Sequence, residues 1–303
     1  MLKYRDELHL CSCLSHQLRS IMKKLLCKSI ALRRTVRIGI PASAAGMQRK
    51  ISPKEPHRNG FAGIPPSDGF TAHHEVIVEC IGVPDARTGY LIGIQEIDAL
   101  VRAHLAPLLE SFFRSSQPIH PADAVTHMGD ILQRNFPQAI PLSTIQWSPG
   151  PFVNYIWSTS MRDHAIMTEQ FEFSAAHRLH CPELSDDENR RTFGKCNHPS
   201  GHGHNYRIAV AVRVRTGAGA PALTTGALEA IVTRTVLDRF DHRHLNVDCV
   251  EFAELNPSVE NIAQVCHDLL SDEITAAGAA LDHVTVWETA KTSATYPARS
   301  LTD

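Results

Sequence analysis

The sequence lacks the features that would direct it to a membrane, to nucleic acid or to an oxidising environment. None of its apolar runs approaches the roughly 20 residues that a membrane-spanning helix needs. A net charge of −2 gives no general attraction to nucleic acid or to an acidic membrane surface. The eight cysteines are scattered and form no dense disulfide framework. We therefore expect a cytoplasmic protein with neither nucleic-acid nor membrane partners.

Aromatic residues make up only 6% of the chain, whereas histidine is abundant, with 18 residues. Ten of these histidines follow residue 160, which places the expected chemistry in the C-terminal half. The hydrophobic fraction of 43% and the charged fraction of 20% are ordinary for a globular protein. A chain of 303 residues predicts one large domain or two of about 150 residues.

The order of segments predicts an extension followed by two related domains. Residues 1–34 are basic but lack the apolar core and cleavage site of a signal peptide, so we predict a poorly ordered extension. Ser-Ala-Ala begins at Ser43 and again at Ser174, 131 positions later, and the same offset carries His204 onto His73. Such self-similarity predicts a tandem repeat, with domains at 35–160 and 161–303.

Each half is expected to contain two strands, two helices and a further strand. Strict alternation of apolar and other residues predicts a strand over 207–215. Apolar residues at helical spacing predict a helix over 93–109 in the first half and another over 228–240 in the second. Ser258 is a natural N-cap for the next helix, and the last predicted strand covers 284–288.

Three histidines in the second half form a candidate metal site. If the strand begins a few residues early, His202 and His204 lie on one of its faces, because side chains two apart share a face. With His177 they supply three imidazoles, which suit a first-row divalent metal and zinc above all. Three protein ligands leave the fourth position open, as in catalytic sites. The alternative is that these are separate surface or core histidines.

The first half is predicted to keep the fold without the site. At the offset of 131, His177 becomes Gly46, Cys196 becomes Pro65 and His202 becomes Thr71. Only His204 keeps a histidine, and one ligand of three cannot hold zinc in the same way.

Four other polar residues are candidates for the chemistry of the site. Cys196 is a fourth metal ligand, a buried filler or a reactive thiol acting as a base. Asp241 beside His242 is either a pair that orients the imidazole or a solvated helix end. Glu288 emerges from an apolar strand face, where it pairs with an arginine or grips a ligand that offers two parallel N–H donors.

These residues occur in a sequence context that resembles the 6-pyruvoyl-tetrahydropterin synthase family, which includes the bacterial 6-carboxy-tetrahydropterin synthases. The resemblance covers about residues 165–296 and rests on FSAAHRLHCPELSDDENRRTFGKCNHPSGHGHNY, FDHRHLN, NPSVENIA and VTVWET. The first half resembles the same fold more weakly, over HHEVIVECIG and ARTGYLIGIQEID. The implied class is α+β: two tandem tunnelling-fold units, each a four-stranded antiparallel sheet with two helices on one face.

The resemblance also assigns roles to individual residues. It implies zinc ligation by His177, His202 and His204, a catalytic Cys196, a pterin anchor at Glu288, and a proton-relay pair of Asp241 and His242. In this family the pair comes from a neighbouring subunit, so a homo-oligomer is implied. With two units in each chain, three chains could give six units and three active sites, the first half acting as a scaffold.

The implied reaction begins from 7,8-dihydroneopterin triphosphate. The pyruvoyl-type enzymes release triphosphate and form 6-pyruvoyl-tetrahydropterin, whereas the carboxy-type lose acetaldehyde and lead toward queuosine. Five residues separate Cys196 from His202 here, as in the pyruvoyl type, whereas the carboxy type usually has three. The further alternative is a non-catalytic pterin-binding or assembly protein, because the first half shows that the lineage tolerates site loss.

Overall fold

The protein is described by a computed structural model that covers residues 29–42, 70–138, 140–217 and 223–298. Most of the predicted N-terminal extension lies outside these residues. The prediction was wrong for the last part of this extension, because the first strand starts at Ile30 and not at Thr35. Residues Ile30–Arg34 pair with Val78–Gly82, so this basic segment is held by backbone hydrogen bonds of a sheet.

The described chain forms two compact units. The first contains the described residues up to Arg114 together with Met128–Ile145, and the second contains Ser115–His127 and the described residues from Gln146 onward. This division differs from the predicted limits at 35–160 and 161–303. Strand β4 (Val153–Ser158) explains part of the difference, because it pairs antiparallel with β5 (Met161–His177).

The first unit contains an antiparallel pair of long strands. Strand β1 pairs with β2 over twelve residues each, and their alternate apolar side chains are buried. The predicted helix over 93–109 is confirmed, and it continues to Arg114 through one π-helical turn. The elements assigned wholly or partly to this unit are β1 (Ile30–Pro41), β2 (Thr71–Gly82), α3 (Ile94–Leu100), η2 (Val101–Leu105), α4 (Ala106–Arg114), α5 (Pro121–Asn135) and β3 (Leu142–Ser148).

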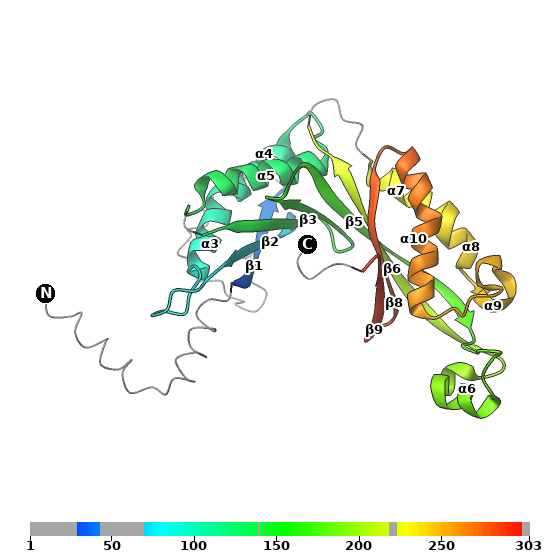
Figure 1. Cartoon of the computed structure of the whole chain (residues 1–303). Coiled ribbons are helices and arrows are strands. Elements are labelled where there is room, and N and C mark those ends of the chain that lie inside the picture. Colours follow the sequence, from blue (N-terminus) through cyan, green and yellow to red (C-terminus); the bar gives the residue numbers. More distant parts are fainter. Residues whose placement is uncertain (1–28, 43–69, 139, 218–222, 299–303) are drawn as a thin grey trace, which may run out of the picture. The chain divides into compact units, whose positions relative to one another are not determined.

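The second unit is an antiparallel sheet in the order β4-β5-β6-β8-β9, to which the short β7 adds a parallel pairing with β5. Helices α7, α8 and α10 lie on one side of these strands (Figure 1). Beyond β4 and β5, its elements are α6 (Asp186–Phe193), η3 (Gly194–Asn197), β6 (His202–Arg215), α7 (Thr225–Val232), η4 (Thr233–Leu237), α8 (Asp238–Phe240), β7 (Arg243–His244), α9 (Leu245–Asp248), η5 (Val250–Phe252), α10 (Val259–Ala276), β8 (Ala280–Thr289) and β9 (Thr292–Tyr296).

The α+β class and the tunnelling-fold arrangement expected from the resemblance are confirmed for this unit. The predicted helical stripe is buried along its whole length, at Leu228, Ile231, Val232, Thr235, Val236 and Phe240. Helix α10 begins after Ser258, whose hydroxyl accepts a hydrogen bond from the Asn261 backbone N–H as an N-cap should. These apolar faces cover the sheet, since an amphipathic helix is stabilised mainly by burying its stripe.

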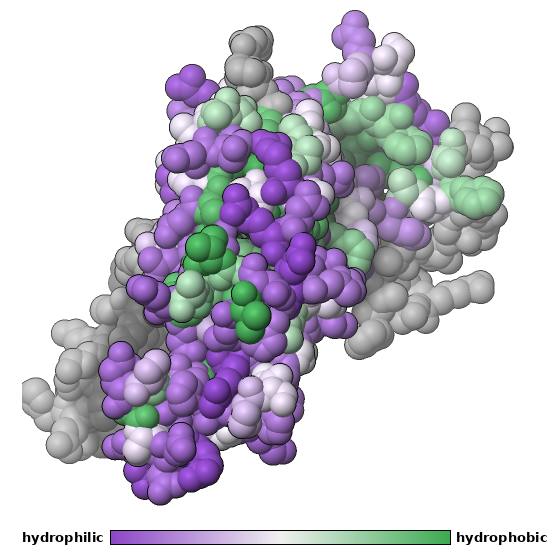
Figure 2. Space-filling model, turned by 90° about the vertical axis from the view of Figure 1, so that its right-hand side faces the viewer, coloured by the Kyte–Doolittle hydropathy of each residue, from purple (hydrophilic) through white to green (hydrophobic). Residues whose placement is uncertain are grey.

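The outer surface of the helical side is largely hydrophilic, with a few apolar patches (Figure 2). None of the helices in the described residues is both long enough and apolar enough to cross a membrane. Each of the five cysteines that the structure describes is free, namely Cys80, Cys181, Cys196, Cys249 and Cys266.

Candidate metal centre

The three predicted histidines come together where β5 ends and β6 begins. The antiparallel register sets His177 opposite His202 and Ala175 opposite His204. One candidate ligand atom from each imidazole lies within 4.8 Å of the others, which is close enough for one ion to bridge them. The structure therefore brings His177, His202 and His204 together, and their role as metal ligands stays a prediction.

A backbone carbonyl fixes the orientation of His177. Its Nδ1 lies 2.7 Å from the carbonyl oxygen of Pro257, the residue just before the N-cap of α10. A carbonyl oxygen can only accept, so Nδ1 must carry the proton and the Nε2 lone pair is free. That Nε2 lies 3.1 Å from Nε2 of His202, so the lone pair points into the cluster. Protein ligands to metals are commonly held by an outer hydrogen bond of this kind.

The cluster is prepared for a cation in its electrostatics as well as its shape. Burial, which outweighs the opposing hydrogen bond to Pro257 and is reinforced by the neighbouring imidazoles, lowers the pKa of His177 to about 4, so the ring is neutral near pH 7. Burial also lowers the pKa of His202. The buried Nε2 of His204 and Nδ1 of His202 have no hydrogen-bond partner. Buried imidazole nitrogens without a hydrogen-bond partner fit a divalent metal, which would supply the missing partner.

A glycine allows the chain to approach the cluster closely. Gly201 has a φ of +69°, a conformation that L-residues with a side chain rarely adopt. A Cβ atom there would lie 2.7 Å from Nε2 of His244 and 2.8 Å from the carbonyl oxygen of His177. Glycine at this position therefore lets β6 start directly beside the end of β5.

Glu288 lies beside the histidines. Its Oε1 is 3.5 Å from Nε2 of His177 and 3.6 Å from Nε2 of His204, and its side chain is 17% exposed. The apolar face of β8 thus delivers a carboxylate to the rim of the cluster, where it is within reach of both a bound cation and a ligand. The two uses considered from the sequence were an arginine partner and a ligand, and it is the second that this position favours.

Cys196 stands beside the cluster without joining it. It lies in η3, and its sulfur is not among the atoms that converge within 4.8 Å in the described chain. Burial raises the pKa of the Cys196 thiol, and the negative charge of Glu288 raises it further. A closed site of three histidines and one cysteine is therefore not what this geometry presents.

The Asp241–His242 pair is formed, but it faces solvent. One carboxylate oxygen of Asp241 accepts from the Ser174 backbone N–H at 2.8 Å, and the other lies 2.8 Å from Nδ1 of His242. The Ser174 hydrogen bond and the His242 contact lower the pKa of Asp241. His242 has a φ of +57° and a side chain that is 82% exposed. In the described residues, no hydrogen bond or ion pair links this pair to the histidine cluster.

Tyr206 is a buried polar residue that the sequence reasoning did not single out. It is fully buried, its hydroxyl has no partner, and burial together with Glu288 and Cys196 raises its pKa. Its ring lies 5.5 Å from that of His204 and 6.1 Å from that of His177. Because it follows His204 by two residues on the same strand, the two-residue period was a signal that could have identified it.

Strand register changes one detail of the comparison between the halves. His73 lies opposite Gly39, and Thr71 opposite Pro41, in the β1–β2 pair. Matched by register to the β5–β6 pair, the position of His177 therefore corresponds to Pro41 and not to Gly46, which lies outside the described residues. The prediction that the first half lacks the metal site keeps the same basis, because only His73 of the three matched positions is a histidine.

Comparison with known proteins places the second unit in a family. The 6-pyruvoyl tetrahydropterin synthase family matches residues 166–299. The human 6-pyruvoyl tetrahydrobiopterin synthase is 34% identical over 110 residues, which are 36% of this chain and 76% of the human protein. The Drosophila melanogaster protein of that name is 37% identical over 106 residues, 34% of this chain and 62% of the fly protein, so the match spans less than two thirds of its length.

Among solved structures, that of Caenorhabditis elegans 6-pyruvoyl tetrahydropterin synthase is 36% identical in sequence, with a TM-score of 0.41. The match covers 44% of this chain and 95% of the worm protein. On the sequence identity and the coverage of the human relative, the chain belongs to the 6-pyruvoyl tetrahydropterin synthase family.

Proposed function

We propose that this protein is a zinc-dependent lyase of the 6-pyruvoyl-tetrahydropterin synthase type. It acts on 7,8-dihydroneopterin triphosphate and releases triphosphate. The observation that carries this proposal is the cluster of three imidazoles whose candidate ligand atoms lie within 4.8 Å of one another, set in a chain of this family. Relatives that bear this name support the reaction.

The metal would be held by His177, His202 and His204. The hydrogen bond from His177 Nδ1 to the Pro257 carbonyl presets one ligand, and the unpartnered buried nitrogens of the other two rings favour the same role. When bound, zinc would supply Lewis-acid chemistry at this site, which would make a C–H group of the substrate side chain more acidic. With three protein ligands, room remains for the substrate side chain.

Two neighbouring residues would act on the substrate itself. Glu288 would accept hydrogen bonds from the flat N–H edge of the pterin, because paired N–H donors match a carboxylate. Cys196 would take up and return a proton as a general base, once a bound cation offsets the burial that now raises its thiol pKa. Its separation from the converging nitrogens leaves it free for this task.

The Asp241–His242 pair would serve the site of a neighbouring chain. The 82% exposure of the His242 side chain suits a group that reaches into another subunit. Its backbone N–H is fixed by a 2.6 Å hydrogen bond to the Ser174 carbonyl, which holds the left-handed conformation in place. The protein would therefore be a homo-oligomer. It would act in the cytoplasm, as expected from its sequence.

The first half would be a second tunnelling-fold unit without a metal site. Its long helix and that of the second half each contain a five-residue π-helical turn, η2 and η4, at corresponding places. A shared irregularity of this kind supports a common origin, since π-helical turns are rare. Three such chains would give six units and three active sites.

A turnover experiment tests the proposal. Purified, zinc-loaded protein is incubated with 7,8-dihydroneopterin triphosphate, and triphosphate release is measured. Mass analysis of the pterin product distinguishes pyruvoyl formation, which we propose, from the carboxy product. Cys196→Ala should abolish turnover, whereas Cys181→Ala, a matched change at a cysteine whose thiol donates a hydrogen bond to Glu183, should not. A zinc-loaded protein without turnover would contradict the proposal.

The degenerate first half motivates a second candidate, a pterin-binding or assembly protein without catalysis. At the positions matched by strand register, Pro41 and Thr71 stand in place of two ligands, so the first half would lack the metal. Under this alternative, pterin binding would be unaffected by Cys196→Ala and the unsubstituted protein would be inactive.

A further inference from the structure

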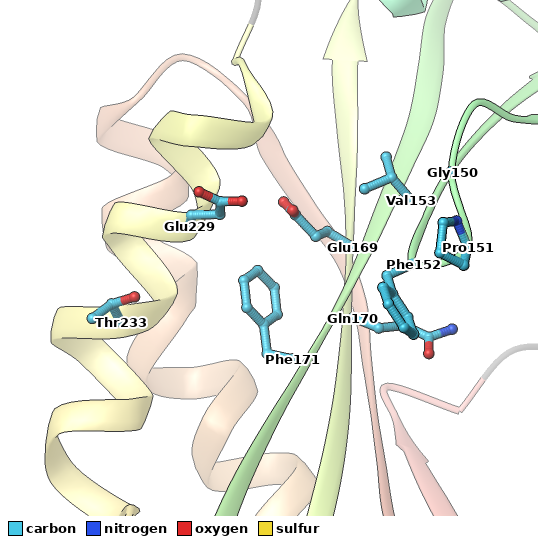
Figure 3. A pocket seen from close by; sticks show the side chains of 9 residues that line it. All are labelled: Gly150, Pro151, Phe152, Val153, Glu169, Gln170, Phe171, Glu229 and Thr233. Atoms are coloured by element: carbon cyan, nitrogen blue, oxygen red, sulfur yellow. The ribbon is translucent and has the colours of Figure 1, made fainter. Parts of the chain in front are cut away.

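A pocket lies in the second unit, on the side of the sheet that the helices cover. Its volume is about 440 Å³, and it lies between α7, β5 and the start of β4 (Figure 3). Glu169 in this pocket precedes His177 by eight residues on β5, or about 26 Å at the rise of an extended strand. The pocket is thus separate from the metal centre.

Two carboxylates face each other across this pocket. Glu169 projects from β5 and Glu229 from α7, and their side chains point toward one another (Figure 3). Glu169 is only 6% exposed, and its buried Oε2 has no hydrogen-bond partner. A carboxylate that is buried and unsatisfied is costly unless a proton or a cation accompanies it.

The protonation of the Glu169–Glu229 pair indicates that the pocket lacks a cation. Burial, together with the charge of the facing Glu229 carboxylate, raises the pKa of Glu169 to about 7. Tyr155 from β4 also interacts with Glu169, but burial raises its own pKa to about 12, so it adds no charge. In the pocket no basic side chain lies among the lining residues. Two like charges without a counter-ion hold a shared proton until a cation replaces it.

The other walls decide between a metal ion and an organic cation. Phe171 lies beside the carboxylate pair, and Phe152, which is 63% exposed, lines the pocket from the β4 side. Calcium and magnesium are bound by oxygen ligands and water, and neither ion would use the aromatic walls of this pocket. Aromatic rings with carboxylates favour a flat organic cation, which binds ring faces and donates paired N–H groups.

We propose that this pocket binds a small ligand with an amidinium or guanidinium group, which the carboxylates of Glu169 and Glu229 hold beside Phe171. The proposal is independent of the reaction at the metal centre. It assigns a recognition role to a buried acid that the proposed catalysis does not use.

Benzamidine is a direct probe, because it joins an amidinium to an aromatic ring. Its binding to the full-length, zinc-loaded protein is measured by calorimetry beside benzamide, a neutral analogue of similar shape. We expect benzamidine to bind at least about tenfold more tightly than benzamide, or ~1.4 kcal/mol. Because the cation replaces a proton on a group with a pKa of about 7, its affinity should rise about tenfold from pH 6 to pH 8.

Variants separate the pocket from general acidic attraction. Glu229→Gln should weaken benzamidine binding at least about tenfold, and because Glu229 is exposed, the fold should tolerate the change. The control is Glu254→Gln, at an exposed glutamate outside the pocket, which should bind as the unsubstituted protein does. Three outcomes would each overturn the proposal. They are equal binding of benzamidine and benzamide, unchanged affinity in a folded Glu229→Gln protein, and no binding at about 10 mM benzamidine, which would mean a Kd weaker than millimolar.

Discussion

The Nδ1 atom of His177 donates a hydrogen bond of 2.7 Å to the carbonyl oxygen of Pro257, 80 residues further along the chain. This contact joins the end of β5 to the residue pair that starts α10, where Ser258 caps the helix. It fixes the tautomer of one imidazole before any ion arrives. The helical layer therefore positions the candidate site as well as covering the sheet.

The first prediction concerns the metal. His202→Ala should lower zinc affinity more than about tenfold, because it removes one of three protein ligands. His198→Ala is the matched control, since His198 is exposed and outside the converging cluster. Zinc affinity is measured by competition with a chromophoric chelator. Equal zinc affinity in the two variants would show that the imidazole cluster does not bind the ion.

The second prediction concerns Gly201. Gly201→Ala places a Cβ atom 2.8 Å from the His177 carbonyl and retains a positive φ, so it should destabilise the protein by about 1–3 kcal/mol. Zinc affinity should fall with it, because the shift needed to relieve the clash moves His202. Urea unfolding and zinc competition measure the two effects.

The matched control for Gly201 lies in α7. A Cβ atom at Gly226 meets nothing within 4 Å, and alanine is preferred to glycine in a helix. Gly226→Ala should therefore leave zinc affinity unchanged and keep or raise stability. A Gly201→Ala protein that unfolds like Gly226→Ala would show that the close approach of the strands tolerates a side chain.

Much of the fold and the identity of the triad followed from short-range patterns. Alternation predicted β6, helical spacing predicted the stripe along α7 to α8, and the two-residue period placed His202 and His204 together. The Pro257 contact did not follow, because the packing of α10 onto β8 and β9 brings together residues that no local period relates.

The misplaced counterpart of His177 has a physical cause in loop length. Between β1 and β2 there are 29 residues, but only 24 lie between β5 and β6. A single offset of 131 therefore cannot align both strands, and it moved the match from Pro41 to Gly46. Loop lengths vary because insertions at the surface cost little free energy. Under the proposed tandem repeat, the strand pairing, which the sequence does not reveal, sets the equivalence between the halves.

The third prediction concerns Asp282, which lies beside Arg213 at 2.6 Å and His283 at 2.7 Å. Burial alone would raise its pKa, but hydrogen bonds from these two residues lower it to about 2. A depressed acid contributes stability above its unfolded pKa, and the contribution is lost as the pH falls from about 4 to about 2.

Asp282→Asn should therefore destabilise the protein by about 2 kcal/mol at pH 6, and the difference should shrink near pH 3. Urea unfolding at both pH values measures it. Asp272→Asn, at an exposed position on α10, is the control and should show little change. An Asp282→Asn difference that is the same at pH 6 and pH 3 would mean that the loss is one of packing and not of charge.

The last prediction concerns the contribution of Glu169 to the free energy of unfolding. Burial raises the pKa of this residue to about 7. An acid with a raised folded-state pKa favours the folded state while protonated, so its contribution is full below the unfolded pKa of about 4.3 and is lost as the pH rises through about 7. Glutamine resembles the protonated form at every pH. As the pH rises from 5 to 8, the free energy of unfolding of Glu169→Gln should therefore increase relative to that of the unsubstituted protein by about 1–3 kcal/mol.

Urea unfolding of Glu169→Gln, Glu254→Gln and the unsubstituted protein across this range makes the comparison. The Glu254→Gln profile should run parallel to that of the unsubstituted protein, because its carboxylate is exposed. Benzamidine should remove part of the difference at pH 8, since a bound cation offsets the charge that the buried carboxylate acquires there. If all three pH profiles ran parallel, Glu169 would not be the strained acid that its burial and its facing carboxylate indicate.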